Sequence, residues 1–180
     1  MKKVFILFLV IIFVLPCFSQ ENADVRTEKN VLKVNTLGLI VGTGSIFYEH
    51  KLSDMTSGQL GFAYLGFKIA DTKLSGLILT PEVRIYPRKN ALDGFYVAPY
   101  LRYQNYTLKE GANEGSISVI GGGLLLGRQW IKKSGFTMDL FFGGGYGSSK
   151  LKVKSGTDVF NLDLIKGFGP RIGFALGFAF

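Results

Sequence analysis

Large apolar side chains recur at every second position along most of the chain beyond residue 30. The pattern is plainest in the final stretch, IGFALGFAF (172–180), where Ile, Phe or Leu alternates with Gly or Ala. Successive side chains of a strand point to opposite faces, so this segment has one face of large apolar groups and one of small groups. A half-buried strand of a soluble protein would carry polar residues on its second face. The ending therefore predicts a strand whose large side chains face lipid.

The same period of two predicts eight strands, each close to or longer than the ~9–11 residues that a tilted membrane strand needs. Tight turns are expected on one side of the membrane at 53–57, 87–94 and 132–135, and longer connections on the other side at 109–115 and 152–159. The pattern favours an all-β, eight-stranded antiparallel up-and-down transmembrane β-barrel. The strands are expected at 31–41, 44–52, 58–69, 76–87, 95–107, 116–131, 135–148 and 164–180.

The two faces of these strands differ in chemistry. Within 76–87, Glu82 and Arg84 lie on one face, and the other face carries Leu77, Leu79, Val83 and Ile85. A soluble barrel with an apolar interior is the alternative, but it would bury such charges or expose rows of Phe and Leu. The pattern therefore favours a membrane barrel with a polar lumen, although it leaves the facing of Arg128 and of the first and sixth strands open.

The position of their turn predicts the register of the last two strands, and parity provides a check. If their turn centres on 156–158, the numbers of paired residues sum to about 314, which places Phe168 opposite Tyr146 and Phe180 opposite Ser134. Both apolar faces then carry even numbers, so the pairing keeps the lipid-facing sides together. We expect this hairpin to project above the membrane.

The N-terminus has a different composition. Two lysines precede an apolar stretch from Val4 to Phe18, and a cleavage site is expected after Ser19. This arrangement predicts a secretory signal peptide at 1–19, which is too short to be a spanning helix. We expect 20–30 to form a short periplasmic segment and 31–180 to form the barrel.

Charge and cysteine content limit the possible binding partners, disulfides and metal ligands. Loss of the signal peptide lowers Lys+Arg from 21 to 19 against 13 acidic residues. This basic balance suits an anionic membrane surface, since an exported protein rarely meets nucleic acid. The single cysteine, Cys17, leaves with the signal peptide, so the mature chain has no disulfide and no thiolate metal ligand.

Four segments stand out along the mature chain: KVNTLGLIVGTGSIFYEHKLS, TPEVRIYPR, GFYVAPYLRY and the ending GFGPRIGFALGFAF. Together they resemble a family of small Bacteroidota outer-membrane barrels that carries a domain of unknown function. The architecture of that family is similar to that of OmpX and the OmpA membrane domain. The resemblance covers most of the mature chain and implies an eight-stranded outer-membrane barrel, but no activity.

No segment predicts a catalytic, cofactor or metal site. GGGYGSSK (143–150) lacks the ending of a phosphate-binding loop, and no amphipathic helix follows it. His50 is the only histidine. Some small outer-membrane barrels hydrolyse or transfer lipid A acyl chains with a histidine at the outer leaflet, whereas His50 is expected near the periplasmic end of its strand. A lipid A-modifying enzyme is the first alternative, which the lipid A profile of His50→Ala would test.

Charged residues on the lumen face are expected to pair, because a lone charge at low dielectric is costly. The set is nearly balanced and would plug a barrel that is too narrow for an open pore. The second alternative is a small gated channel whose ion pairs exchange partners. The expected network is Lys33, Glu49, Glu82, Arg84, Arg102, Asp139 and Arg171.

Two further sets concern the membrane itself. Alternating apolar residues that end in a C-terminal Phe resemble the signal read by the outer-membrane barrel assembly machinery, here Phe174, Leu176, Phe178 and Phe180. Four lysines continue the lipid-facing phase just above the bilayer, where they would contact lipopolysaccharide phosphates. These are Lys150, Lys152, Lys154 and Lys166.

These patterns predict a monomeric, non-enzymatic outer-membrane barrel with a plugged lumen and a structural or surface-interaction role. The segments 149–163 and 108–115 are the expected contact surfaces. No cofactor is expected.

Overall fold

The computed structural model describes residues 28–40, 42–69, 72–110, 113–155 and 167–180, and the predicted signal peptide lies outside these ranges. Side chains are described throughout them except at 67–69, 72–73, 108–110, 113–114 and 150–155. The strands are β1 (Asn30–Asn35), β2 (Thr43–Lys51), β3 (Thr56–Ile69), β4 (Thr72–Ile85), β5 (Gly94–Glu110), β6 (Asn113–Ile131), β7 (Phe136–Ser155) and β8 (Gly167–Ala179).

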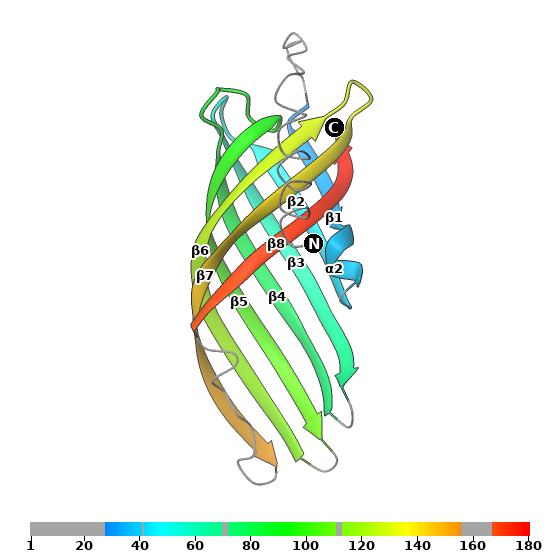
Figure 1. Ribbon diagram of the computed structural model, residues 1–180, viewed down its shortest axis with the longest axis vertical. Helices are drawn as coiled ribbons and strands as arrows, with labels where there is room; N and C mark the ends of the chain where they lie inside the picture. Colours follow the sequence, from blue (N-terminus) through cyan, green and yellow to red (C-terminus); the bar gives the residue numbers. More distant parts are fainter. Residues whose placement is uncertain (1–27, 41, 70–71, 111–112, 156–166) are drawn as a thin grey trace, which may run out of the picture.

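The eight strands form one closed barrel in which each pairs with its sequence neighbours and β8 returns to β1. Every pairing is antiparallel. The predicted all-β, eight-stranded antiparallel up-and-down barrel is therefore confirmed, and Figure 1 shows its strongly tilted strands.

The first predicted strand, 31–41, is only half correct. The strand β1 ends at Asn35 and a short helix, α2 (Thr36–Ile40), follows it. The Asn35 side-chain oxygen accepts a hydrogen bond from the Gly38 amide at 3.1 Å, which caps the helix start. Gly42 has a φ of 75°, a value that favours glycine, and it turns the chain into β2. Among the described residues, no helix is long and apolar enough to cross a membrane.

The two ends of the barrel differ (Figure 1). One end carries the C-terminal Phe180 and the connections 52–55, 86–93 and 132–135, close to the predicted tight turns. We call it the C-terminal end. In its first turn the ammonium of Lys51 lies 2.9 Å from the carboxylate of Asp54, and this hydrogen bond lowers the pKa of the exposed Asp54 carboxyl below its ordinary value.

At the opposite end the strands β3 to β7 run well past α2 (Figure 1). The segment 109–115 is not a loop as predicted, because β5 extends to Glu110 and β6 starts at Asn113. The strand β7 likewise continues to Ser155, beyond its predicted end at 148. The strands continue here because β5 pairs with β6, and β6 with β7, over this region. This pairing provides hydrogen-bond partners for the backbone, which the predicted loops would have lacked.

The predicted register of the last two strands is confirmed over β7 and β8. Phe136 pairs with Phe178 and Tyr146 with Phe168, so the paired numbers sum to 314 as expected. The predicted turn at 156–158 lies outside the described residues.

Alternation along the strands separates an inner from an outer face. In β8, Gly173, Ala175 and Ala179 are buried, whereas Ile172 and Phe178 are 66% and 53% exposed. A side chain at Gly173 would collide with the ring of Phe141, which fills the lumen there. The small residues of the C-terminal stretch are therefore required by a narrow interior.

The outer face is a continuous apolar band. Arg128, whose facing the pattern left open, shares the outward phase of exposed Leu124 and Leu126. Its guanidinium lies over the rings of Phe95, at 4.7 Å, and Trp130, at 5.2 Å. Large apolar side chains exposed elsewhere in the band include Leu32, Ile46, Phe62, Leu79, Leu101, Ile120, Phe142, Phe168 and Phe180.

Candidate functional site: the lumen network

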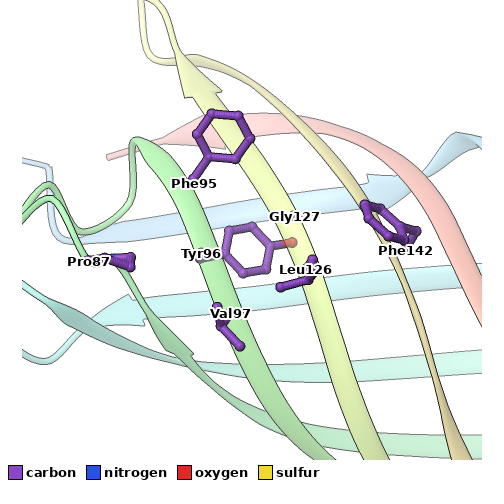
Figure 2. Close-up of a pocket in the computed structure, with 7 residues that line it drawn as sticks. All are labelled: Pro87, Phe95, Tyr96, Val97, Leu126, Gly127 and Phe142. Carbon is purple, nitrogen blue, oxygen red and sulfur yellow. The ribbon is translucent and has the colours of Figure 1, made fainter. Parts of the chain in front are cut away.

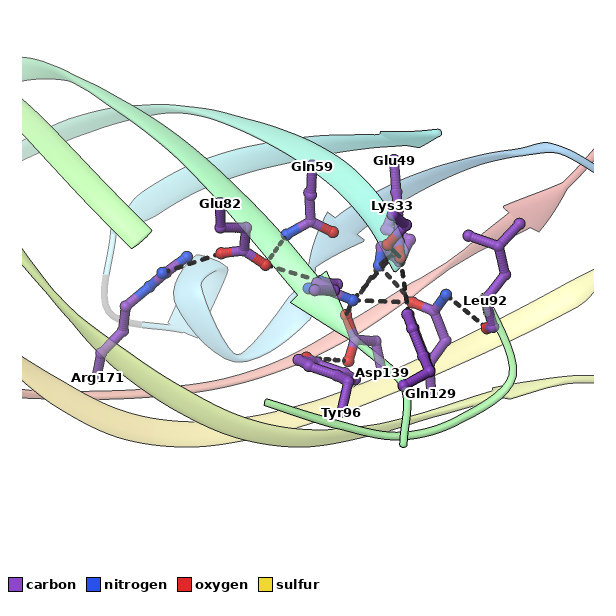
Figure 3. A network of polar contacts seen from close by, with 12 residues as sticks. Lys33, Glu49, Gln59, Glu82, Leu92, Tyr96, Gln129, Asp139 and Arg171 are labelled. Carbon is purple, nitrogen blue, oxygen red and sulfur yellow. Dashed lines mark hydrogen bonds and ion pairs between the residues drawn. The ribbon is translucent and has the colours of Figure 1, made fainter. Parts of the chain in front are cut away.

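Charged side chains from β1, β2, β4, β7 and β8 meet inside the C-terminal half of the barrel (Figure 3). The centre of this lumen network is fully buried, with 0% side-chain exposure for Lys33, Glu49, Arg84 and Asp139. Each residue occupies the inward phase of its strand, because outward positions of the same strands carry the apolar band. The alternation thus brings together charges that are far apart along the chain.

Lys33 is one of two cations at the centre. Its ammonium lies 2.6 Å from a Glu49 carboxylate oxygen and 2.9 Å from an Asp139 carboxylate oxygen. It also donates to the side-chain oxygen of Gln129. The three donors of a lysine ammonium are therefore all engaged.

Arg84 is the second cation and contacts the same acceptors. Its Nη1 lies 2.8 Å from Asp139 and 3.1 Å from Glu49, and its Nε lies 2.8 Å from Glu82. Glu82 in turn accepts from Arg171 at 3.2 Å, which extends the network toward the opposite end. The Arg171 guanidinium also lies 4.8 Å from the Tyr100 ring centroid, a cation–π contact.

Neutral groups donate further hydrogen bonds to the three carboxylates. Tyr86 and Ser57 donate to Glu49 at 2.8 and 2.6 Å. Tyr96 donates to Asp139 at 2.8 Å, and Gln59 donates to Glu82 at 2.6 Å. A buried carboxylate needs such additional donors, because one ion pair rarely offsets the loss of its hydration.

The connection 86–93 packs against the C-terminal end of the barrel. Leu92 is 1% exposed and packs with Val31, Ile131 and Ala179. Its carbonyl oxygen accepts from Gln129 at 2.8 Å, so the loop is joined directly to the network (Figure 3). The φ of Leu92, 80°, lies in a region that non-glycine residues rarely adopt.

Six of the seven expected network residues are connected in this way. They are three cations and three anions, so the connected set is electrically neutral. Arg102 is the exception. Its buried Nε has no hydrogen-bond partner among the described residues, and it stands two positions beyond Tyr100 on β5. The strand phase predicts that Arg102 faces the lumen, but it does not predict how far Arg102 lies from the carboxylates.

The chain matches, over residues 6–157, the family described as a protein of unknown function (DUF3575). It belongs to the DUF3575 family. This DUF3575 chain is also similar in structure to the crystal structure of Acinetobacter baumannii CarO, with 13% sequence identity and a TM-score of 0.44. That match covers 88% of this chain and 100% of CarO. No curated protein matches the chain at a significant level.

The sole histidine of this DUF3575 chain lies away from the lumen network. His50 is exposed near the end of β2, and its Nδ1 lies 2.8 Å from the side-chain oxygen of Asn30. Within the described part of the chain, no three His, Cys, Asp or Glu side chains form a group that would hold a metal ion.

The two expected membrane-contact sets are only partly described. Phe174, Leu176, Phe178 and Phe180 occupy the outward phase of the C-terminal strand, with Phe180 just past its end. The side chains of Lys150, Lys152 and Lys154 lie outside the described residues, as does all of Lys166.

Several members of the lumen network were not expected from the sequence. Tyr86 and Tyr96 continue the inward phase of Glu82 and Arg84 and of Arg102, and Gln59 lies on the buried face of β3, so strand phase is the signal that would have found all three. Gln129 lies on β6, whose facing the pattern left open. Nothing in the alternation indicates that a loop residue, Leu92, enters the lumen.

Proposed function

We propose that this DUF3575 chain is an integral outer-membrane barrel with a sealed lumen and a structural or surface-contact role, without catalysis. The observation that carries the proposal is the combination of an exposed apolar band outside and a neutral, buried ion-pair network inside. A soluble protein rarely exposes so extensive an apolar surface. In a membrane, lipid tails would contact the apolar band, and the closed sheet would leave no unpaired strand edge in the hydrocarbon.

Orientation follows from the two ends. Short connections face the periplasm in bacterial outer-membrane barrels, and the longer hairpins face outward. The C-terminal end is therefore proposed to be periplasmic, with Phe174, Leu176, Phe178 and Phe180 read by the assembly machinery during insertion. The part of β3 to β7 that extends past α2 is then the surface available to extracellular partners. Closure of the sheet on itself supports a monomer.

Side chains that occupy the lumen support the proposed seal. The network spans the interior, aromatic rings pack beside it, and Leu92 covers the periplasmic side. Phe47 and Phe141 meet edge to face at 6.1 Å, and Tyr86 and Tyr96 pack at 5.6 Å. An eight-stranded barrel is just wide enough for side chains to fill, so these groups support a sealed lumen.

The first expected result is a heat-dependent shift in gel mobility with no ion conductance. A folded barrel resists SDS until it is boiled, so the outer-membrane fraction should give two mobilities, and the purified protein should be silent in planar bilayers. Loss of the shift together with recovery in the soluble periplasm would overturn the membrane assignment.

A gated channel is the second candidate, because Glu82 is shared between Arg84 and Arg171 and such pairs can exchange partners. Under the sealed-lumen proposal, Glu82→Gln stays silent in bilayers, since the side-chain volume is retained. Conductance that appears in Glu82→Gln would favour the channel.

An unchanged lipid A profile is expected in His50→Ala, because the exposed side chain of His50 lies near the proposed periplasmic end.

Lipopolysaccharide is the proposed outer-leaflet partner. Replacing Lys150, Lys152, Lys154 and Lys166 with Gln should leave the heat-dependent shift intact and lower the lipopolysaccharide that copurifies. Each ammonium near an anionic surface contributes on the order of 1 kcal/mol. Quantifying bound lipopolysaccharide per barrel checks this, and unchanged retention would contradict it.

A further inference from the structure

An apolar groove of about 210 Å³ lies across β5, β6 and β7 near the C-terminal end of the barrel. Figure 2 shows its walls: Phe95 and Val97 on β5, Leu126 on β6 and Phe142 on β7. Val97, Leu126 and Phe142 are cross-strand neighbours and form one row of the outer face. Pro87 from the connection 86–93 also lines the groove.

A cation stands in the next row toward the C-terminal end. Arg128 is the direct cross-strand partner of Phe95, and its guanidinium lies 4.7 Å from the centroid of that ring. The same guanidinium lies 5.2 Å from the ring centroid of Trp130, the only tryptophan of the chain. The groove therefore has apolar walls and a positively charged rim.

More basic residues surround that rim. The stretches 86–93 and 128–135 together contain five basic residues and one acidic residue, Asp93. Gln129 bonds to the Leu92 carbonyl, so the two stretches are adjacent in space. The five cations are Arg88, Lys89, Arg128, Lys132 and Lys133, and all but the half-buried Arg128 are exposed.

We propose that this groove binds one acyl chain of an anionic phospholipid from the periplasmic leaflet, with the lipid phosphate at Arg128. The inference rests on the proposed membrane location. The aliphatic walls suit an acyl chain, and a guanidinium binds phosphate oxygens through a planar pair of N–H donors. The charge complementarity selects an anionic head group over a zwitterionic one, because the rim carries a marked excess of positive charge.

The position of Trp130 makes the site directly measurable. Bromine atoms on an acyl chain quench a nearby tryptophan, and this chain has only one. The folded full-length barrel is reconstituted in phosphatidylcholine vesicles containing a fixed small fraction of phosphatidylglycerol, with only one of the two lipids brominated near the head-group end of its chains. Quenching per brominated lipid then reports the local enrichment of each lipid at Trp130. We expect phosphatidylglycerol to be enriched on the order of fivefold.

Two charge variants at the same end of the barrel provide the comparison. Arg128→Gln should abolish most of the enrichment, whereas Lys51→Gln, with the same charge change on β2, should retain it. Val97→Phe, which fills the groove without altering charge, should also reduce it. Gel mobility before and after boiling verifies that each variant is folded.

The outcomes separate this site from the membrane assignment itself. Absence of quenching by either lipid would show that the protein does not enter the bilayer and would overturn the proposed function. Equal quenching by both lipids, or equal loss in Arg128→Gln and Lys51→Gln, would leave the membrane barrel standing and overturn the lipid site. Selective loss in Arg128→Gln and Val97→Phe supports the site.

Discussion

Replacing Arg84 with Met is expected to destabilise the folded barrel by about 3–5 kcal/mol, the cost of removing one partner from a buried ion pair. Arg84 contacts Glu49, Glu82 and Asp139, all of them buried. Without it, the network retains two cations, Lys33 and Arg171, against three anions. Methionine approximates the length of the arginine stem, so the change isolates charge from volume. The free energy of unfolding in urea, measured in lipid vesicles, checks the prediction.

Two controls show whether the loss comes from the buried charge. Arg88→Gln removes an exposed arginine from the connection 86–93 and should change the free energy of unfolding by less than about 0.5 kcal/mol. Adding Asp139→Asn to Arg84→Met restores equal numbers of cations and anions and should recover part of the loss. A single Arg84→Met variant as stable as the wild type would contradict the network's role.

Substitution of Gly177 by Ala is expected to weaken closure of the barrel by about 1–3 kcal/mol, the usual cost of overpacking. Gly177 pairs with Lys33 in the seam where β8 meets β1. An added Cβ would collide with the backbone carbonyl of Leu32 and would come 2.8 Å from the Lys33 Cα. Backbone atoms cannot rotate away as a side-chain end can, so the two strands must separate. Such a shift also moves Lys33 out of the lumen network.

The same strand supplies the matched control. Gly169 also lies on β8, but a Cβ there meets nothing within 4 Å. Gly169→Ala should therefore leave the unfolding free energy near that of the wild type, and the gel-mobility shift should persist. Equal effects of the two substitutions would show that the contact at the seam does not limit closure.

Most of the barrel follows from local pattern. Alternation needs only neighbouring residues to be read, so strand number and the facing of β4, β7 and β8 could be predicted from the sequence. The turn centre expected at 156–158 then gave the register of β7 against β8, and parity supported it, because a shift by one residue would turn every lipid-facing side chain inward. The inward charges could be assigned for the same reason.

Contacts between distant segments account for what the pattern missed. Residues 36–40 fit a strand equally well by sequence, but the Asn35 side chain caps a helix there. Arg102 shares the phase of its strand with Tyr96, yet only tertiary placement shows that it lies beyond the anions that Arg84 reaches. Leu92 enters the lumen from a loop, where no periodicity exists to indicate a facing.

One physical cause separates the features that the sequence predicts from those that only the tertiary structure shows. Whether a side chain faces lipid or lumen is a property of one strand, and the period of two states it directly. Which lumen side chains touch depends on strand tilt and stagger around the closed sheet, and these are set by all eight strands together. The sequence therefore specifies a barrel with an apolar outer face and a charged interior. The identity of each ion pair, the contact of Leu92 with the network and the groove beside Arg128 emerge only when the sheet closes.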